Sequence, residues 1–580
     1  MATTDHWTDN AYASLQDQHP PVFTINRSDL ENSSIDWQNF AFNQPLVLKP
    51  KKSLREHQSS ALKAVTKGLE TADRGKLIMA CGTGKTFTSL KIAEQMAGKG
   101  KKVLFLVPSL ALLSQSLTEW TQEADVPLHS FAVCSDSDVG KQGKGQKAED
   151  DRIQQLIHEL QYPATTNAKM LVKEMAAQNR ELAMTVVFST YHSIDVIHQA
   201  QQLGLGEFDL VICDEAHRTT GASFENSEEE SVFVRVHDNN YLQAKKRLYM
   251  TATPRIYTED AKKTEGVTVY SMDDKATFGE ELYVISFSSA VKQGLLVDYK
   301  VLVLAVEESH IHQSLEKLFE GTEIQVDDAA KIVGCWKALS KYGIMDNLGD
   351  SEPMKRAVAF CQVINKDYKG KHHKVSSIAI SEIFGSVVEA YQKQEIEALQ
   401  EENPDFVPDM SLLLQCQAEH VDGSMNASEK SAKINWLKEE SEENTCRILS
   451  NVRCLSEGVD VPALDAVLFL TPRSSQVDVV QSVGRVMRKA EGKKRGYVIL
   501  PVVIPAGVSP EEALDKNENY KVVWQVLNAL RAHDDRFDAM INKMEFDGAA
   551  KDKIEVIAQV SKILPKIAKK PSKTKKKATG

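Results

Sequence analysis

The apolar positions in the first half of the chain form short unbroken runs that alternate with stretches of helical spacing. Runs of about four to eight residues between helical patterns are typical of buried strands in a parallel sheet. The runs of this kind are residues 77–80, 103–107, 185–191, 208–213 and 247–250. Helical spacing is found at residues 54–69 and again at Phe87, Leu90, Ala93 and Ala97. Strand, helix and strand in succession form the unit of a parallel sheet.

The second half repeats this alternation, so we predict a second sheet of similar design and an α/β fold class. Its expected strands are residues 301–305, 357–360, 411–414, 447–449, 466–470 and 496–501. A helical region is expected at 369–406, and the chain becomes helical again beyond residue 505. Residues 136–180 and 306–355 interrupt the alternation, and we interpret them as insertions, the second of them helical.

Length and composition indicate a multidomain protein without a membrane segment. At 580 residues the chain is too long for one core and suggests roughly three or four domains. Its 42% hydrophobic and 26% charged residues are ordinary for a soluble globular protein. No apolar run approaches the ~18 residues that span a bilayer, and the first residues lack the apolar core of a signal peptide. A cytoplasmic location is therefore expected.

The cysteine positions and the net charge limit which metal sites and ligands this protein can have. The eight cysteines are scattered singly with no C-x-x-C pair, which argues against a zinc or iron–sulfur site and for reduced, mostly buried thiols. A net charge of −11 is unfavourable for a nucleic-acid ligand unless the charges are segregated. The acidic runs 228–230 and 439–443 are expected on solvated faces. The lysine-rich end, residues 566–580, is expected to be disordered, either as a DNA-binding tail or as a solubilising one.

The first predicted strand runs directly into glycines and then into a helix. Gly82 and Gly84 allow the backbone of the loop, with Thr83 between them, to turn its N–H groups toward a phosphate. Lys85 follows at a helix N-terminus, which also favours an anion. Thr86 supplies a hydroxyl for Mg²⁺. We therefore predict a phosphate-binding loop that takes ATP with Mg²⁺, whereas the alternative is a plain glycine turn.

The strand at 208–213 ends in the sequence Asp-Glu-Ala-His. Two carboxylates directly after a buried strand are costly unless they have a function. We expect Asp214 to hold Mg²⁺ and Glu215 to accept a proton from the attacking water. His217 is placed to link the nucleotide site to the next strand. A surface acidic turn is the alternative.

Two further polar positions have two interpretations each. Gln58, on the helix before the loop, can pair with the adenine edge and select ATP, or it is a solvent-facing polar residue. The Ser and Thr residues at the end of the strand 185–191 either contact nucleic-acid phosphates or cap the following helix.

A basic pair near the end of the second half resembles an arginine finger. Arg485 and Arg488 are three residues apart, so they are expected on one face of a helix. A rigid guanidinium on a separate domain can stabilise the γ-phosphate during hydrolysis, which in GTPases is worth about 10³ to 10⁵ in rate. The alternative is an exposed basic helix.

Taken in order over residues 54–490, these motifs resemble those of superfamily 2 helicases, with an A-x-x-G-x-G-K-T form of the first motif. The resemblance implies tandem RecA-like domains and adds Gly458 and Asp460 to the nucleotide-binding residues and Gln481 to the catalytic ones. It also implies that Thr251 and Thr253 couple hydrolysis to motion, with a helix cap as the alternative. The resulting domains are an N-terminal extension lying against the first domain (1–45), an ATP-binding domain (46–285), a helicase C-terminal domain (286–505), a helical segment (506–565) and the lysine-rich tail (566–580).

Four stretches resemble more closely the helicase-like motor of the single-chain Type ISP restriction–modification enzymes. They are residues 75–91, 107–115, 214–222 and 524–535. The resemblance implies a motor that moves along double-stranded DNA beside nuclease and methyltransferase regions. This chain has too few residues before the motor for a nuclease domain and lacks an Asn-Pro-Pro-Tyr motif. Separate nuclease or methyltransferase subunits are therefore expected as partners.

The function we predict is that of an ATP-dependent DNA helicase or translocase, with the motor of a restriction or phage-defence system as one setting for it. The first alternative is a double-stranded DNA translocase that never separates strands. The second is a nucleotide-gated DNA-binding subunit of a larger complex that does not cycle continuously.

Overall fold

The computed structural model describes most of the chain as two compact units. The described residues are 30, 33–134, 164–224, 232–257, 267–315, 324–341, 352–365, 375–409, 413–423, 425, 427–452, 455, 464–473, 475–504, 521–534 and 554–558. The first unit runs to Leu295, and the second holds most of the chain from Leu296. The division falls after the expected boundary at residue 285, because the short helix α10 (Phe287–Lys292) still belongs to the first unit.

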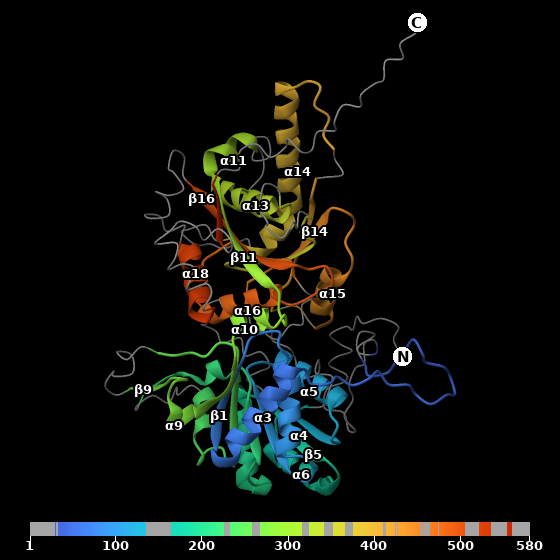
Figure 1. Ribbon diagram of the computed structural model, residues 1–580, viewed down its shortest axis with the longest axis vertical. Helices are drawn as coiled ribbons and strands as arrows, with labels where there is room; N and C mark the ends of the chain where they lie inside the picture. The colour runs from blue at the N-terminus through green and yellow to red at the C-terminus, as the bar shows by residue number, and fades with distance from the viewer. Residues whose placement is uncertain are drawn as a thin grey trace. The chain divides into compact units, whose positions relative to one another are not determined.

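The first unit contains a parallel eight-stranded sheet with the order β10-β1-β8-β6-β2-β5-β3-β4. Figure 1 labels two of its strands, β1 and β5. All its strand pairs are parallel, as the strand–helix alternation predicts. The strands are β1 (Arg74–Met79), β2 (Lys102–Val107), β3 (Leu128–Val133), β4 (Ala164–Thr165), β5 (Met184–Thr190), β6 (Leu210–Cys213), β8 (Arg247–Thr251) and β10 (Glu280–Ile285). A separate antiparallel pair joins β7 (Gly221–Phe224) and β9 (Val267–Tyr270).

Helices cover both faces of this sheet, because successive strand residues point to opposite sides. Phe105 of β2 packs against Trp120 on one face, whereas its neighbours Leu104 and Leu106 join a cluster with Leu171 on the other. The helices are α3 (Glu56–Thr71), α4 (Lys85–Met96), α5 (Leu110–Glu123), α6 (Ala168–Ala177), α7 (Ile194–Ala200), α9 (Lys275–Phe278) and α10, with the shorter turns η3 (Arg180–Leu182), η4 (Tyr191–Ser193), η5 (Gln201–Leu205), η6 (Ala216–Thr219) and η7 (Val232–His237).

The second unit contains a parallel seven-stranded sheet with the order β13-β14-β12-β15-β16-β11-β17. Its pairs are again all parallel. The strands are β11 (Asp298–Glu307), β12 (Arg356–Phe360), β13 (Gln415–His420), β14 (Thr445–Asn451), β15 (Ala466–Phe469), β16 (Arg495–Ile504) and β17 (Ile554–Ala558). The α/β class with two parallel sheets flanked by helices is thus confirmed.

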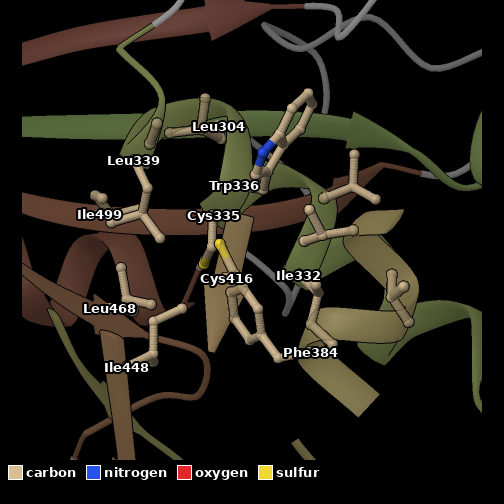
Figure 2. Packing of buried hydrophobic residues seen from close by; sticks show 14 of the residues in the cluster. Leu304, Ile332, Cys335, Trp336, Leu339, Phe384, Cys416, Ile448, Leu468 and Ile499 are labelled. Atoms are coloured by element: carbon tan, nitrogen blue, oxygen red, sulfur yellow. The ribbon is translucent and has the colours of Figure 1, made fainter. Parts of the chain in front are cut away.

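The core of the second unit lies between its sheet and the helices α13 and α14. Figure 2 shows Trp336 and Leu339 of α13 and Phe384 of α14 gathered with Leu304 and Ile499 of the strands. On another side, α16 packs against α18 and against β15 and β16. The helices beyond Leu296 are α11 (Glu308–Ser314), α13 (Val326–Leu339), α14 (Ser377–Glu402), α15 (Ala427–Lys438), α16 (Gln476–Val486) and α18 (Lys521–His533).

Four sequence-based expectations are corrected by this fold. The strand expected at 411–414 is β13 at Gln415–His420 instead, an edge strand whose polar sequence hides it. The segment 506–565 is not wholly helical, because β17 joins the sheet beside β11. The helices α6 and α13, expected within insertions, are core elements.

The N-terminal extension is the fourth correction. Its described residues are 30 and 33–45, and they form, with the residues up to 50, a small loop closed by a bridge between Ile35 and Leu48. Trp37 is 40% exposed and Phe42 86%, so these two rings are not buried on the first unit as expected, whereas residues 1–29 lie outside the described part of the chain. Residues 136–163 of the first insertion and the whole lysine-rich tail lie outside the described residues.

The cysteines have the state that their scattered positions predict. Seven described cysteines are free thiols, and six of them are buried. Among the described helices, none combines the length and the apolar character needed to cross a bilayer.

Candidate functional site

The predicted nucleotide residues of the first unit meet at one edge of its sheet. β8 lies between β1 and β6, and all three strands run in the same direction. The loop after β1, the Asp-Glu-Ala-His segment after β6 and the Thr-Ala-Thr segment after β8 therefore emerge side by side. Ligands of open α/β sheets bind at this carboxyl edge.

The loop after β1 has the backbone geometry of an anion cradle. Gly82 and Gly84 have φ of 83° and 85°, values that side chains with a Cβ disfavour. Thr83 closes the turn by donating from both its N–H and its hydroxyl to the Ala80 carbonyl, at 3.3 and 2.6 Å. α4 then begins at Lys85, so the first N–H groups of a twelve-residue helix face the loop.

Two residues at the start of α3 hold this loop from the other side. His57 Nε2 lies 2.9 Å from the Thr83 carbonyl oxygen, and Gln58 Nε2 lies 3.4 and 3.3 Å from the Thr83 and Gly84 carbonyl oxygens. The Gln58 Oε1 accepts from the Arg55 N–H at 2.9 Å. Gln58 is 5% exposed, so the alternative that it is a solvent-facing polar residue is excluded. Its side-chain amide instead contacts the loop.

Trp120 of α5 fixes the beginning of α4. Its indole Nε1 donates to the Thr86 carbonyl oxygen at 3.1 Å, and Ser89 Oγ donates to the same oxygen at 2.7 Å. The backbone of Thr86 is thus anchored while its side chain remains partly exposed.

The Asp-Glu-Ala-His segment turns sharply where β6 ends. The Asp214 N–H donates to the Leu106 carbonyl on β2 at 2.9 Å, and the Tyr191 hydroxyl donates to the Asp214 carbonyl at 2.8 Å. Glu215 takes the left-handed conformation, with φ of 46°, and its N–H donates to Asp214 Oδ1 at 2.9 Å. A glutamate in this region is strained, and such strain is typical of functional sites.

Electrostatics keep the buried Glu215 carboxylate ionised. Burial alone would raise its pKa, but Lys85, His217 and Arg218 outweigh burial and lower the pKa of Glu215 to about 2. Lys85 is the strongest of these charges, so the phosphate loop and the acidic segment act on each other. Glu215 is therefore a carboxylate at neutral pH.

His217 joins the acidic segment to β8. Its Nδ1 lies 3.1 Å from Thr251 Oγ1 and 3.4 Å from Glu215 Oε2. The Thr253 N–H donates to Thr251 Oγ1 at 3.0 Å. Residues 254–257 are not helical, so the helix cap considered for Thr253 is not what the structure contains.

A second histidine, His237, links the turn after the Asp-Glu-Ala-His segment to β8. His237, at the end of η7, places Nε2 2.9 Å from the Thr219 carbonyl oxygen and Nδ1 3.0 Å from the Tyr249 hydroxyl of β8. Burial lowers the pKa of His237 to about 4, so the ring is neutral at physiological pH.

The hydroxyls at the end of β5 are buried, and the Ser189 hydroxyl donates to the Thr190 carbonyl oxygen at 3.1 Å. Ser189 and Thr190 are at most 1% exposed, and Thr190 Oγ1 lies 2.8 Å from Ser193 Oγ. Neither serves as a side-chain cap of the following turn, and neither faces solvent where a nucleic-acid phosphate could reach it.

The site has polar atoms to offer a ligand. Glu215 Oε2, His217 Nε2 and Thr253 Oγ1 are buried and have no hydrogen-bond partner among the described residues. Buried polar atoms normally find partners. Together with the glycine cradle and Lys85, this set fits a hydrated Mg²⁺–triphosphate group.

The predicted residues Gln481, Arg485 and Arg488 belong to the second unit. Gln481 and Arg485 lie on α16 and are 5% and 7% exposed, so the exposed basic helix is excluded. The expectation that Arg485 and Arg488 share a helix face is wrong, because α16 ends at Val486 and Arg488 follows in a turn. Gly458 and Asp460 lie outside the described residues.

Sequence reasoning missed several supporting residues. His57 stands beside Gln58, and Tyr191 ends the predicted strand 185–191, so their positions were a usable signal. Trp120 and His237 are far from any motif along the chain, and only the folded sheet brings them to the site.

Family models of restriction enzymes and helicases match stretches in both halves of the chain. Residues 51–256 match a family described as "Type III restriction enzyme, res subunit". Residues 393–490 match "Helicase conserved C-terminal domain", and residues 1–47 match "Restriction endonuclease".

Individual relatives are helicases and restriction enzymes. A probable helicase of African swine fever virus is 24% identical over 501 residues, which are 85% of this chain and 45% of the relative. The Type I restriction enzyme EcoAI endonuclease subunit of Escherichia coli is 23% identical over 54% of this chain and 33% of its own.

Two solved structures share the fold. The ATP-dependent Type ISP restriction–modification enzyme LlaBIII bound to DNA is 40% identical with a TM-score of 0.78, over 96% of this chain and 34% of that one. A nuclease-deletion mutant of LlaGI in complex with a DNA substrate mimic is 33% identical with a TM-score of 0.55, over 87% of this chain and 30% of that one. The chain thus spans less than half the length of the viral relatives and about a third of LlaBIII.

Proposed function

We propose that this chain, which carries the ATP-binding and C-terminal domains of a superfamily 2 helicase, is an ATP-driven motor that moves along double-stranded DNA in a restriction system. The observation that carries this proposal is the connected set Lys85, Glu215, His217 and Thr251. It runs from the phosphate loop through an ionised carboxylate to the strand beside both.

The first unit binds and activates the nucleotide in this proposal. The loop N–H groups at residues 82–86 and the Lys85 ammonium hold the phosphates. Mg²⁺, when bound, neutralises phosphate charge, and the Thr86 hydroxyl and the Asp214 carboxylate are the residues to hold it. Glu215, ionised by its surroundings, orients the attacking water and accepts its proton.

The hydrogen bond between His217 and Thr251 is the proposed coupling element. Glu215 Oε2 lies 3.4 Å from His217 Nδ1, so protonation of the Glu215 carboxylate weakens its attraction for that ring nitrogen and alters the contact between the nitrogen and Thr251. Thr251 and Thr253 then receive the change through the Oγ1 that accepts the Thr253 N–H. Gln58 contributes by holding the loop; selection of adenine remains part of the proposal.

The second unit contributes to hydrolysis through Gln481, Arg485 and Arg488. A buried guanidinium on α16 is positioned by packing rather than by solvent, which suits a rigid phosphate-binding fork. Gly458 and Asp460 are proposed as further nucleotide-binding residues.

DNA is the proposed track because both Type ISP structures are complexes with DNA or a DNA mimic. Binding is expected mainly through phosphates, without base readout. The similarity to restriction enzymes makes a nuclease or a methyltransferase the proposed working partner. The restriction-endonuclease match at residues 1–47 lies within this chain, so it ties the chain itself to a nuclease family.

The test is ATPase activity of the full chain with double-stranded DNA, single-stranded DNA, RNA or no ligand. We expect the greatest stimulation by double-stranded DNA. Stimulation by RNA alone would refute the choice of track. One turnover per binding event, without sustained hydrolysis, would instead support a nucleotide-gated clamp.

A strand-separating helicase is the second candidate, because the viral relative is described as a helicase. A triplex-displacement assay detects movement along a duplex, whereas a strand-displacement assay detects unwinding. We expect ATP-dependent displacement of the triplex strand with the duplex left intact.

A further inference from the structure

A partly buried lysine, Lys493, lies at the point where α16 ends and the chain leads to Arg488. Lys493 Nζ donates to three carbonyl oxygens: those of Leu464 and Val486 at 2.5 Å each and that of Arg488 at 3.1 Å. Val486 is the last residue of α16, and Arg488 is the second residue after it. One ammonium group therefore bridges the end of the helix and the turn beyond it.

The carbonyls at this helix end need such a donor. The last carbonyls of a helix lack intrahelical partners and carry partial negative charge, which favours a cation. The backbone also bonds here, because the Val297 N–H donates to the Met487 carbonyl at 2.9 Å and the Arg488 N–H donates to the Arg485 carbonyl at 3.3 Å. Lys493 supplies the bonds on either side of Met487.

The strand β16 approaches the same helix end closely. A Cβ on Gly496 would lie 2.3 Å from the Val486 carbonyl oxygen, so only glycine permits this approach without movement. The close approach brings Lys493, three residues earlier in the chain, under the end of α16. Gly496 and Lys493 therefore both lie at the Val486 carbonyl, at the end of α16.

We infer that Lys493 is a positioning residue for ATP hydrolysis, one that fixes the chain segment from Arg485 to Arg488 through its three carbonyl contacts. The inference rests on the proposed function, in which these arginines promote hydrolysis. The ammonium group of Lys493 donates to backbone carbonyls, so its effect on hydrolysis passes through the arginines.

The charge of Lys493 provides a readout that separates positioning from simple packing. Burial lowers the pKa of Lys493 to about 8, Asp465 opposes this shift and the Arg488 guanidinium adds to it. Below this pH the ammonium holds three carbonyls, and above it a neutral amine has lost a proton and the attraction of a cation for the helix end. An arginine at this position stays charged over the whole range.

The experiment compares the full-length parent, Lys493→Met, Lys493→Arg and Lys489→Met by DNA-stimulated ATPase between pH 7 and 9.5. Lys489 is an exposed lysine of the same segment and serves as the matched control. For Lys493→Met we expect kcat to fall roughly ten- to a hundred-fold with KM for ATP little changed, as for other displaced catalytic geometry. Lys493→Arg should keep kcat at pH 7.5 and lose the decline that the parent shows above about pH 8. Lys489→Met should match the parent.

Two results would overturn the inference. One is a parental kcat in Lys493→Met, and the other is an unchanged alkaline decline in Lys493→Arg, which also decides the case if Lys493→Met does not fold. Arg485→Ala, measured in parallel, separates the two levels: if it retains parental activity, the proposed role of the arginines fails. Hydrogen exchange of a peptide covering residues 483–490 needs no activity, and faster exchange in Lys493→Met than in Lys489→Met is expected.

Discussion

Glu215 combines three features that a structural glutamate rarely has together. It is buried, its backbone is left-handed, and its pKa is lowered to about 2. Burial opposes ionisation, so the ionised state depends on Lys85, His217 and Arg218. A neutral amide of the same shape would keep the contacts and lose the base.

Replacing Glu215 by glutamine should therefore separate binding from turnover. We expect Glu215→Gln to bind ATP with parental affinity and to lose roughly 10²- to 10⁴-fold in kcat, the range of general-base catalysis. Fluorescent-nucleotide titration and steady-state ATPase measure the two quantities. Hydrolysis at the parental rate would refute the role of Glu215.

His237 makes the first unit sensitive to acid. Its pKa is about 4 in the folded chain and near 6.5 in the unfolded one, so the unfolded chain binds the proton first. Stability is then complete above pH 6.5 and is lost as the pH falls toward 4, by on the order of 3 kcal/mol.

Denaturant unfolding at pH 7, 6, 5 and 4 tests this expectation. In His237→Gln the free energy of unfolding should start lower at pH 7 but lack this part of the acid dependence. Identical pH profiles for the parent and the variant would show that His237 does not titrate as expected.

At the scale of elements, the loop after β1 depends on a conformation that only glycine adopts easily. A Cβ on Gly84 would lie 2.4 Å from Gln58 Nε2, in addition to the positive φ. Gly84→Ala should displace the loop and its clamp, a strain of about 1–3 kcal/mol that corresponds to a roughly ten- to hundred-fold loss in ATP affinity. Isothermal titration with a non-hydrolysable ATP analogue measures it.

Gly100→Ala is the matched control for that loop variant. Gly100 also has positive φ, at 80°, but a Cβ added there would meet nothing within 4 Å, and the residue lies in the turn two residues before β2. The substitution should cost stability without affecting ATP affinity. Equal losses of affinity in both variants would indicate a general effect of strain instead of the loop clamp.

The helix α13 shows that an apparent insertion can be a core element. Trp336 is 3% exposed, packs beside Tyr391 and donates its Nε1 to the Leu414 carbonyl at 3.0 Å. Trp336→Ala should destabilise the second unit by about 3–5 kcal/mol. Trp524→Ala, at a residue 50% exposed on α18, should change stability by less than about 1 kcal/mol. Urea unfolding followed by circular dichroism compares the two.

At the scale of the whole molecule, an acidic protein is expected to hold an acidic polymer. With a net charge of −11, attraction must come from local lysines and arginines that release counterions from DNA. Affinity should fall by about 10³- to 10⁵-fold between 50 and 200 mM salt if six to ten phosphates are contacted. Fluorescence anisotropy with duplexes of unrelated sequence tests this, and a nearly salt-independent affinity would contradict phosphate binding.

Much of this architecture follows from the sequence because buried parallel strands are apolar throughout. β1, β2, β5, β6 and β8 were all predictable for this reason. β13 was not, since it is an edge strand with the sequence Gln-Cys-Gln-Ala-Glu-His, and the apolar run before it attracted the prediction. β17 was missed because its partner β11 lies some 250 residues earlier in the chain.

The candidate site divides in the same way. Residues whose role depends on local geometry, such as Gly82, Gly84 and Lys85, were found from their spacing. Residues that act across the sheet, such as Trp120 and Lys493, depend on packing that no local pattern shows. The prediction that Arg488 lies on the same helix face as Arg485 was wrong because α16 ends at Val486, one residue after Arg485.

The pairing of β17 with β11 also bears on how the chain is made. During synthesis β11 leaves the ribosome long before its outer neighbour exists, because Ile554–Ala558 is translated some 250 residues after Asp298–Glu307. Until then that side of the sheet presents unpaired backbone groups, which invite association with other nascent chains. Expression yield should consequently depend on chaperones that shield this edge, and ribosomes that stop before residue 554 should release products prone to aggregation.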